Sequence, residues 1–135
     1  MKKIYLIYLL LFMQFSAHGQ EIRCGWLDNP TPGNLWLIDR DAEWNISQQG
    51  GRESEGIEKI IDNSIDSSEV IHTNGNYGVR CACLSVEVDK KSRNIIKIYS
   101  FDLLKIKQCR NDKKIQKFYQ LDLIEIRRLI LFLNI

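Results

Sequence analysis

The chain has 135 residues, of which 19 are Lys or Arg, 17 are Asp or Glu, and 44% are hydrophobic. This length suits one small domain, which buries only about 60–68% of the surface that its unfolded chain exposes. The near balance of charges excludes a general electrostatic affinity for nucleic acid.

The first nineteen residues have the three parts of a secretory signal peptide. Two lysines at positions 2 and 3 precede an almost unbroken apolar run, Ile4 to Phe15, and Ala17 and Gly19 are small residues before a cleavage point. The run is shorter than the roughly 17–25 residues that a membrane span needs. We therefore expect a periplasmic or secreted bacterial protein without a stable membrane span, whose mature chain begins at Gln20.

Loss of this segment would remove two lysines and leave 17 basic against 17 acidic residues. The two halves of the mature chain differ in sign. Residues 20–78 carry eleven acidic and four basic side chains, net −7, whereas residues 79–135 carry six acidic and thirteen basic ones, net +7. We interpret this as attraction between the halves within the fold. A polarised surface that selects a charged partner is the alternative.

The segment 24–51 predicts a hairpin preceded by an irregular, proline-rich start. Pro30 and Pro32 disfavour helix in the residues before them. Trp44 and Ile46 would share one face of a half-buried strand. The expected strands are 35–38 and 43–46, with a turn at 39–41.

Residues 52–68 are polar and acidic, but isoleucines at 57, 60, 61 and 65 fall at helical spacing. A glycine at 56 and the polar run 62–64 weaken this pattern. The segment therefore predicts a short helix or an ordered loop.

The clearest strand pattern follows. Residues 69–73, 77–88 and 95–101 alternate or are β-prone, and Asn74-Gly75-Asn76 and the charged run 89–94 are typical turns between them. We expect an antiparallel meander and, for residues 20–114 as a whole, a mainly β domain.

The tail, residues 115–135, has apolar residues at helical spacing together with five charged ones. Each charge would cost about 2.5–3.5 kcal/mol at the centre of a bilayer, which disfavours a membrane span. An amphipathic helix is the first interpretation, and a peripheral, poorly ordered extension is the second.

Four cysteines, Cys24, Cys81, Cys83 and Cys109, suggest two disulfides in an exported chain. A bond between Cys81 and Cys83 would strain a strand, because both side chains point to the same face. Cys24 is then expected to pair with one of them and Cys109 with the other, in an order that stays open. Each bridge would stabilise the fold by roughly 2–4 kcal/mol. A four-cysteine zinc site is the alternative, but it lacks the usual C-x2-C pairs.

All three tryptophans, Trp26, Trp36 and Trp44, lie in the first block. Burial as core residues is the favoured interpretation, with one ring partly exposed. If exposed, they would form a stacking platform for a glycan or peptide, with Asp28 and Asn34 as hydrogen-bonding neighbours.

The sequence offers no catalytic set, and no catalytic residue, metal or cofactor is expected. His72 is the single histidine of the mature chain, and no nucleophile elbow or phosphate-binding glycine loop is present. Asp28, Asp39, Asp41 and Glu43 lie close in sequence but do not follow the spacing of a calcium loop, so we interpret them as a solvated turn.

Several runs together resemble the bacterial family called domain of unknown function 4087. They are Cys24–Asn34, Trp36-Leu37, Asp39–Asp41, Glu43-Trp44, Gln49–Gly51, Tyr77-Gly78, Cys81–Leu84 and Gln108–Arg110. The resemblance covers most of residues 24–112 and implies a small exported protein with four matching cysteines. It brings no activity, substrate or catalytic residue.

These observations favour a non-enzymatic binding or inhibitor protein of the cell envelope, whose partner is another envelope protein. A glycan- or peptidoglycan-binding module using the tryptophans is the second hypothesis. A small hydrolase that uses His72 with a nearby acid is the third. The oligomeric state is left open.

Overall fold

In a computed structural model of the chain, residues 19–63, 67–115 and 129–133 are described. Six strands form one mixed sheet in the order β1-β2-β3-β6-β5-β4. The elements are β1 (Glu21–Thr31), β2 (Asn34–Ile38), β3 (Glu43–Ser47), α2 (Glu58–Asn63), a 3₁₀ turn (Ser67–Glu69), β4 (Ile71–Asn74), β5 (Tyr77–Asp89), β6 (Asn94–Leu104) and α3 (Ile106–Asn111). The predicted fold class, mainly β with two disulfides and a short middle helix, is confirmed.

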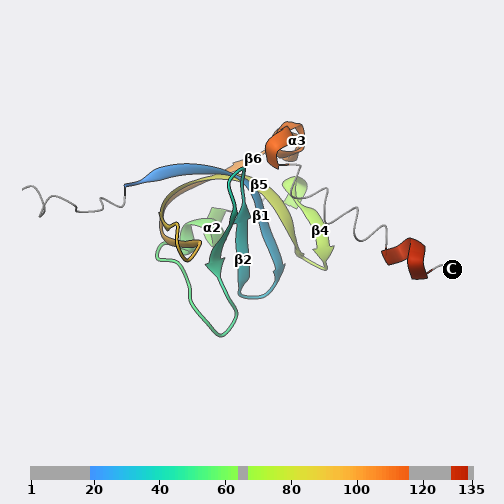
Figure 1. Cartoon of the computed structure of the whole chain (residues 1–135), viewed down its shortest axis with the longest axis horizontal. Coiled ribbons are helices and arrows are strands. Elements are labelled where there is room, and N and C mark those ends of the chain that lie inside the picture. Colours follow the sequence, from blue (N-terminus) through green and yellow to red (C-terminus); the bar gives the residue numbers. More distant parts are fainter. Residues whose placement is uncertain (1–18, 64–66, 116–128, 134–135) are drawn as a thin grey trace, which may run out of the picture.

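Five of the strands close into a ring, because β1 pairs with both β2 and β5, and β3 pairs with β6 in parallel. Figure 1 shows the long strands β1 and β5 curving around the molecule, with α3 outside the sheet. Strand β4 extends the sheet beside the first residues of β5. A closed Greek-key sheet of five strands, with a helix between its third and fourth strands, is the topology of the OB fold.

The junction between β3 and β6 is sealed by the segment 52–55. The Ser54 hydroxyl lies 2.8 Å from the carbonyl oxygen of Ile46 on β3 and 2.5 Å from that of Ile95 on β6. The Arg52 guanidinium donates to the same Ile95 oxygen at 2.6 Å. The chain then turns into α2 at Gly56, which has φ +84° and where a Cβ would collide with a β6 carbonyl oxygen. Residues 52–55, which we call the splint segment, therefore join β3 to β6 where few hydrogen bonds connect the two strands directly.

Two groups of buried side chains lie on opposite faces of the sheet. The inner core fills the closed sheet, and the outer cluster lies between β1, β5 and α3. The inner core consists of Leu27, Leu35, Leu37, Ala42, Trp44, Ile46, Ile57, Ile60, Ala82, Leu84, Val86, Val88, Ile95 and Ile98. The outer cluster consists of Trp26, Val79, Cys81, Cys109 and Ile115. The strands therefore bury apolar area on both faces along part of β1 and β5.

The expected irregular start before the hairpin is wrong, since these residues form most of the 11-residue strand β1. Both prolines lie at the end of the strand or in the turn after it, where a missing N–H costs little. Its inward positions include Arg23 and Gly25, so the apolar alternation is broken. At Gly25 a Cβ would collide with the Ile38 carbonyl oxygen of β2, which explains the absence of a side chain.

The other elements follow the sequence more closely. The meander is present as β4, β5 and β6, and the middle helix is α2. The predicted signal peptide up to residue 18, the isoleucine at 65 and tail residues 116–128 lie outside the described residues. Residues 129–133 are helical, with exposed side chains. Within the described ranges, no helix is long and apolar enough to cross a membrane.

Candidate ligand-binding site

Two arginines point into the closed sheet. Side chains alternate along a strand, so Arg23 on β1 shares a face with Leu27 of the inner core, and Arg80 on β5 shares a face with Ala82 and Leu84. The two strands are antiparallel, with Arg80 opposite Leu27 and Arg23 opposite Leu84. The arginines are therefore four strand positions apart, about 13 Å.

Arg23 is fully paired. Its guanidinium donates to carboxylate oxygens of Glu21 at 2.8 Å, Asp39 at 2.7 Å and Asp41 at 3.0 Å. It also stacks 4.0 Å from the centre of the Trp44 ring, a favourable cation–π geometry. Burial alone would lower the pKa of Arg23, but the hydrogen bonds to these three carboxylates raise it above the ordinary value. This end of the sheet is saturated.

Arg80 lies at the other end and lines a cavity of about 340 Å³. The turn between β1 and β2, helix α2 and the start of β5 enclose this space, which we call the Arg80 cavity. Its walls are mostly apolar. The lining residues are Leu27, Asn29, Pro32, Gly33, Leu35, Ser47, Glu53, Ile57, Ile60, Ile61, Tyr77 and Arg80. Four of them belong to the inner core, so the cavity opens directly from the interior of the sheet.

The guanidinium of Arg80 has no partner within the described part of the chain. The side chain is half-buried; its Nε is buried and makes no hydrogen bond, and none of the ion pairs there includes it. Burial lowers the pKa of Arg80, and no carboxylate offsets that effect. An arginine remains charged under all physiological conditions, so the cavity holds an uncompensated positive charge.

Two further polar groups line the Arg80 cavity without hydrogen bonds to described residues, the Tyr77 hydroxyl and the Glu53 carboxylate. The Asn29 side-chain amide donates to carbonyl oxygens of Thr31 and Asn34, and so orders the turn that forms one wall. The cavity therefore offers donors from Arg80 and Tyr77 and a separate acceptor from Glu53.

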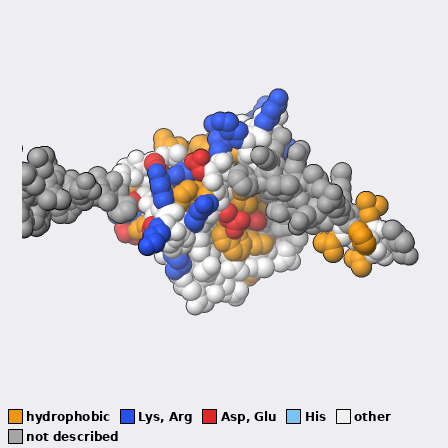
Figure 2. Space-filling view, viewed as in Figure 1, with side chains coloured by type: hydrophobic (Ala, Val, Ile, Leu, Met, Phe, Trp, Pro, Cys, Tyr) orange, Lys and Arg blue, Asp and Glu red, His pale blue; other side chains and the backbone are white. Residues whose placement is uncertain are grey.

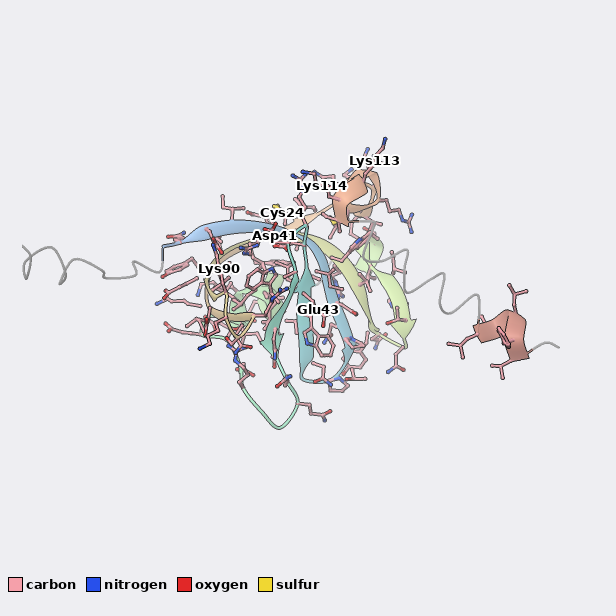
Figure 3. All side chains as sticks on the ribbon, in the orientation of Figure 1. Cys24, Asp41, Glu43, Lys90, Lys113 and Lys114 are labelled. Atoms are coloured by element: carbon pink, nitrogen blue, oxygen red, sulfur yellow. A yellow bond between two sulfur atoms is a disulfide. The ribbon has the colours of Figure 1, made fainter. Side chains whose placement is uncertain are left out.

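A larger hollow of about 440 Å³ is less suited to a ligand. It lies at the start of β1 beside the β5–β6 turn, and Val88 is the one apolar side chain among its lining residues. Lys90 and Lys91, which line it, are exposed, and Figure 3 shows Lys90 at this edge of the sheet. Its lining is mostly polar and exposed, whereas four core residues line the Arg80 cavity.

The proposed tryptophan platform is divided between faces. Trp26 lies in the outer cluster and Trp44 in the inner core, each 3% exposed, whereas Trp36 is partly exposed. Asp28 lies directly opposite Trp36 across the β1–β2 pair. Asn34 donates to the Thr31 hydroxyl oxygen and accepts from the Gln49 amide, so it stabilises turns.

The four cysteines form two bridges, Cys24–Cys83 and Cys81–Cys109. The expected scheme, Cys24 with one member of the close pair and Cys109 with the other, is confirmed, and no described cysteine is free for the alternative zinc site. The first bridge joins facing residues of β1 and β5, and the second ties α3 to the outer cluster.

Of the four acidic residues of the first block, Asp39 and Asp41 contact Arg23, and Glu43 is exposed on β3. Asp39 and Asp41 both bind the Arg23 guanidinium, and Figure 3 shows Asp41 beside Cys24 at the edge of the sheet below α3. His72 is exposed on β4. No group of three or more His, Cys, Asp or Glu side chains suited to a metal ion occurs within the described ranges.

Two ion pairs join the halves of the chain. Lys97–Glu55 at 2.8 Å has the signs of the charge asymmetry, whereas Arg40–Asp112 at 2.7 Å joins a base of the acidic half to an acid of the basic half. On the face shown in Figure 2, acidic and basic side chains lie interspersed over the sheet. Basic side chains also project near α3, where Figure 3 places Lys113 and Lys114. Opposite charges therefore meet within the fold.

Sequence reasoning missed Arg80 and its cavity. A signal was present, because Arg80 follows Gly78 on the inward face of a strand whose next inward residues are Ala82, Leu84, Val86 and Val88. A charged side chain in that register needs a partner, a ligand or access to water.

The fold and the cavity together define a small β domain with a closed sheet, two disulfides and a ligand-sized cavity. The chain belongs to the family described as protein of unknown function (DUF4087), whose model matches residues 18–116. The match agrees with the resemblance seen in the sequence. No curated protein matches the chain significantly. A search of solved structures likewise gives no significant match.

Proposed function

We propose that this protein is a non-enzymatic binding protein of the bacterial cell envelope, which holds a small anionic ligand with an apolar body in the Arg80 cavity. One observation carries the proposal. A guanidinium with a buried, unbonded Nε lines an apolar cavity of about 340 Å³. That volume lies at the small end of the roughly 300–1,000 Å³ typical of ligand pockets.

Arg80 is half-buried beside apolar residues and its Nε makes no hydrogen bond to a described residue, so its guanidinium is less well hydrated than one in open solvent. A bound anion would supply the missing hydrogen bonds. A carboxylate would satisfy the guanidinium with two parallel hydrogen bonds, while the isoleucines and leucines of the walls would contact the apolar part of the ligand.

The envelope location is supported by the signal-peptide pattern of the first nineteen residues and by the two disulfides. Disulfides persist in oxidising compartments such as the periplasm and are rare in the bacterial cytosol. The proposal of a binding role without catalysis is supported by the nature of the cavity lining, which supplies donors and apolar walls but no nucleophile paired with a base.

The test is titration of the purified protein with 3-phenylpropanoate, a carboxylate with an apolar body, monitored by calorimetry and thermal shift. We expect saturable binding that weakens about tenfold or more in Arg80→Met, since a hydrogen bond to a charged group contributes about 1.5–3 kcal/mol. Arg110→Met, which changes an exposed arginine of α3, is the matched control and should bind like the wild type. Equal binding by Arg80→Met and the wild type would refute the proposal.

A second candidate function is glycan binding on the outer face of β2 and β3. It is favoured by the position of Trp36, partly exposed between Asp28 on one neighbouring strand and Asn45 on the other. Aromatic rings flanked by polar side chains stack on sugars, and this face of an OB fold binds oligosaccharides in other proteins. Quenching of tryptophan fluorescence by soluble cell-wall fragments, lost in Trp36→Ala, would support it, and an unchanged spectrum would count against it.

A further inference from the structure

We infer that the ligand of the Arg80 cavity is a free α-amino acid with a bulky apolar side chain, whose carboxylate binds Arg80 and whose ammonium group binds Glu53. This inference rests on the proposed function and narrows its ligand class. It follows from the placement of two opposite charges that line the same cavity without neutralising each other.

Arg80 and Glu53 come from different parts of the closed sheet. Arg80 lies near the start of β5, and Glu53 lies in the splint segment, where it forms an isolated bridge with Ser47 of β3. No ion pair joins the two residues, although both line the cavity. Other cations of the domain that approach a carboxylate do pair with it, as Arg23, Arg40 and Lys97 show.

Each charge is also kept apart from alternative partners. The neighbouring Arg52 is engaged with carbonyl oxygens of Asn45 and Ile95, so it does not neutralise Glu53. The described carboxylates nearest Arg23 are committed to that residue at the other end of the sheet. Arg80 is half-buried and Glu53 lies at the exposed side of the cavity, so a cation and an anion that are unpaired among the described residues line the same space and match a ligand that carries both opposite charges.

The rest of the cavity fits the side chain of such a ligand. Leu27, Leu35, Ile57 and Ile60 are buried residues that line the same cavity and can contact an apolar side chain. The Tyr77 hydroxyl, which has no partner among described residues, can donate a further hydrogen bond to the carboxylate. The modest volume favours a single amino acid over an oligopeptide.

The inference distinguishes a free amino acid from the C-terminal residue of a peptide. In a peptide the nitrogen is an uncharged amide, which offers Glu53 no cation. The C-terminal carboxylate alone would bind Arg80 equally well. A ligand with a free ammonium group should therefore bind more tightly than its acylated counterpart.

The experiment compares four probes of similar shape by calorimetry on the wild-type protein. They are phenylalanine, 3-phenylpropanoate without the amine, 2-phenylethylamine without the carboxylate, and N-acetylphenylalanine as the peptide-end mimic. We expect phenylalanine to bind about fivefold more tightly than 3-phenylpropanoate and N-acetylphenylalanine, because the partly solvated Glu53 contributes about as much as a strong surface ion pair. We expect it to bind about tenfold or more tightly than 2-phenylethylamine.

Two variants assign these preferences to residues. Glu53→Gln should abolish the preference for phenylalanine over 3-phenylpropanoate and leave the affinity for 3-phenylpropanoate unchanged. Arg80→Met should abolish the preference over 2-phenylethylamine. Glu43→Gln, an exposed acid on β3, is the control for Glu53 and should keep both preferences.

The outcomes separate the two claims. Equal or tighter binding of 3-phenylpropanoate by the wild type would overturn the amino-acid inference and leave the proposed anion site standing. Preferences that persist in Glu53→Gln would also overturn it. Absence of binding by all four probes at millimolar concentration would overturn the inference and the proposed function together.

Discussion

The two ends of the closed sheet handle an inward arginine in opposite ways. At one end Arg23 binds three carboxylates and stacks on Trp44. At the other end Arg80 lines a cavity without a partner among the described residues. The two positions lie on paired strands and face the same interior, so the difference lies in what surrounds them.

The partners of a charged side chain distinguish a structural role from a binding role. The carboxylates around Arg23 compensate for its loss of hydration and fix the turn between β2 and β3, since Asp39 also accepts two backbone amides of that turn. Among the described residues, no carboxylate pairs with Arg80. A half-buried charged side chain without a partner is a candidate for function, because a ligand of opposite charge can supply the missing interactions.

The largest expected effect is at Arg23. Arg23→Met should lower the free energy of unfolding by about 3 kcal/mol, because it leaves the buried Asp39 without its counter-charge. Urea unfolding followed by circular dichroism measures this. A loss of stability no larger than that of the exposed control Arg110→Met would contradict the claim that Arg23 stabilises the fold.

The free energy of unfolding should fall by less when Arg23 loses one of its three carboxylate partners. Asp39→Asn keeps an oxygen for the two backbone amides but removes the charge that binds Arg23 at 2.7 Å. We expect a loss of about 2 kcal/mol, the contribution of a hydrogen bond between charged groups. The same unfolding experiment tests this, with the exposed Glu43→Gln as control. An unchanged midpoint would mean that the other two carboxylates compensate fully.

At Arg80 the substitution should have the opposite effect and increase the free energy of unfolding. Arg80→Met replaces a half-buried, unpaired guanidinium with an apolar side chain of similar length, and should raise the ligand-free stability by about 0.5 kcal/mol. Thermal unfolding of the two proteins without ligand is the measurement. A loss of 2 kcal/mol or more, on the order of that expected for a broken buried pair, would show that Arg80 supports the fold.

A third arginine, Arg40, shows what an exposed ion pair contributes to stability. Arg40 is half-exposed and binds Asp112, whose pKa the hydrogen bond from Arg40 holds below its ordinary value. Arg40→Met should cost about 0.5 kcal/mol at neutral pH, as exposed ion pairs do. Because the pKa of Asp112 is depressed in the fold, this contribution is present above the unfolded pKa and disappears as the pH falls through the folded one. Unfolding at pH 7 and pH 3 should show the difference between the proteins shrinking, whereas a constant difference would exclude this pair as its source.

Much of the fold could be predicted from the sequence, because local patterns were sufficient. Period-two alternation in residues 77–88 and turn residues on both sides predicted the meander. The spacing of Cys81 and Cys83 excluded one disulfide scheme. Strand β1 was not predicted, because Arg23 and Gly25 take inward positions where an apolar residue is expected. Arg23 is there because a carboxylate of the β2–β3 turn binds it, and Gly25 because a carbonyl of β2 leaves no room for a side chain.

The candidate site was beyond local patterns. Its lining comes from β1, β2, α2 and β5, and a cavity exists only once these elements close around it. The tryptophans attracted attention because aromatic residues often bind ligands, yet Trp26 and Trp44 are buried on opposite faces. A single arginine in an apolar register was the better signal, and it has meaning only after the strand's inward face is known.

The most direct test of the contrast between the two arginines is an NMR titration that observes the Nε–H signals of Arg23 and Arg80 while phenylalanine is added. We expect the Arg80 signal to shift and its hydrogen exchange to slow as the carboxylate binds, while the Arg23 signal, already hydrogen-bonded to Glu21, stays in place. An Arg80 signal that remains unchanged while other residues of the protein respond to the ligand would contradict the account.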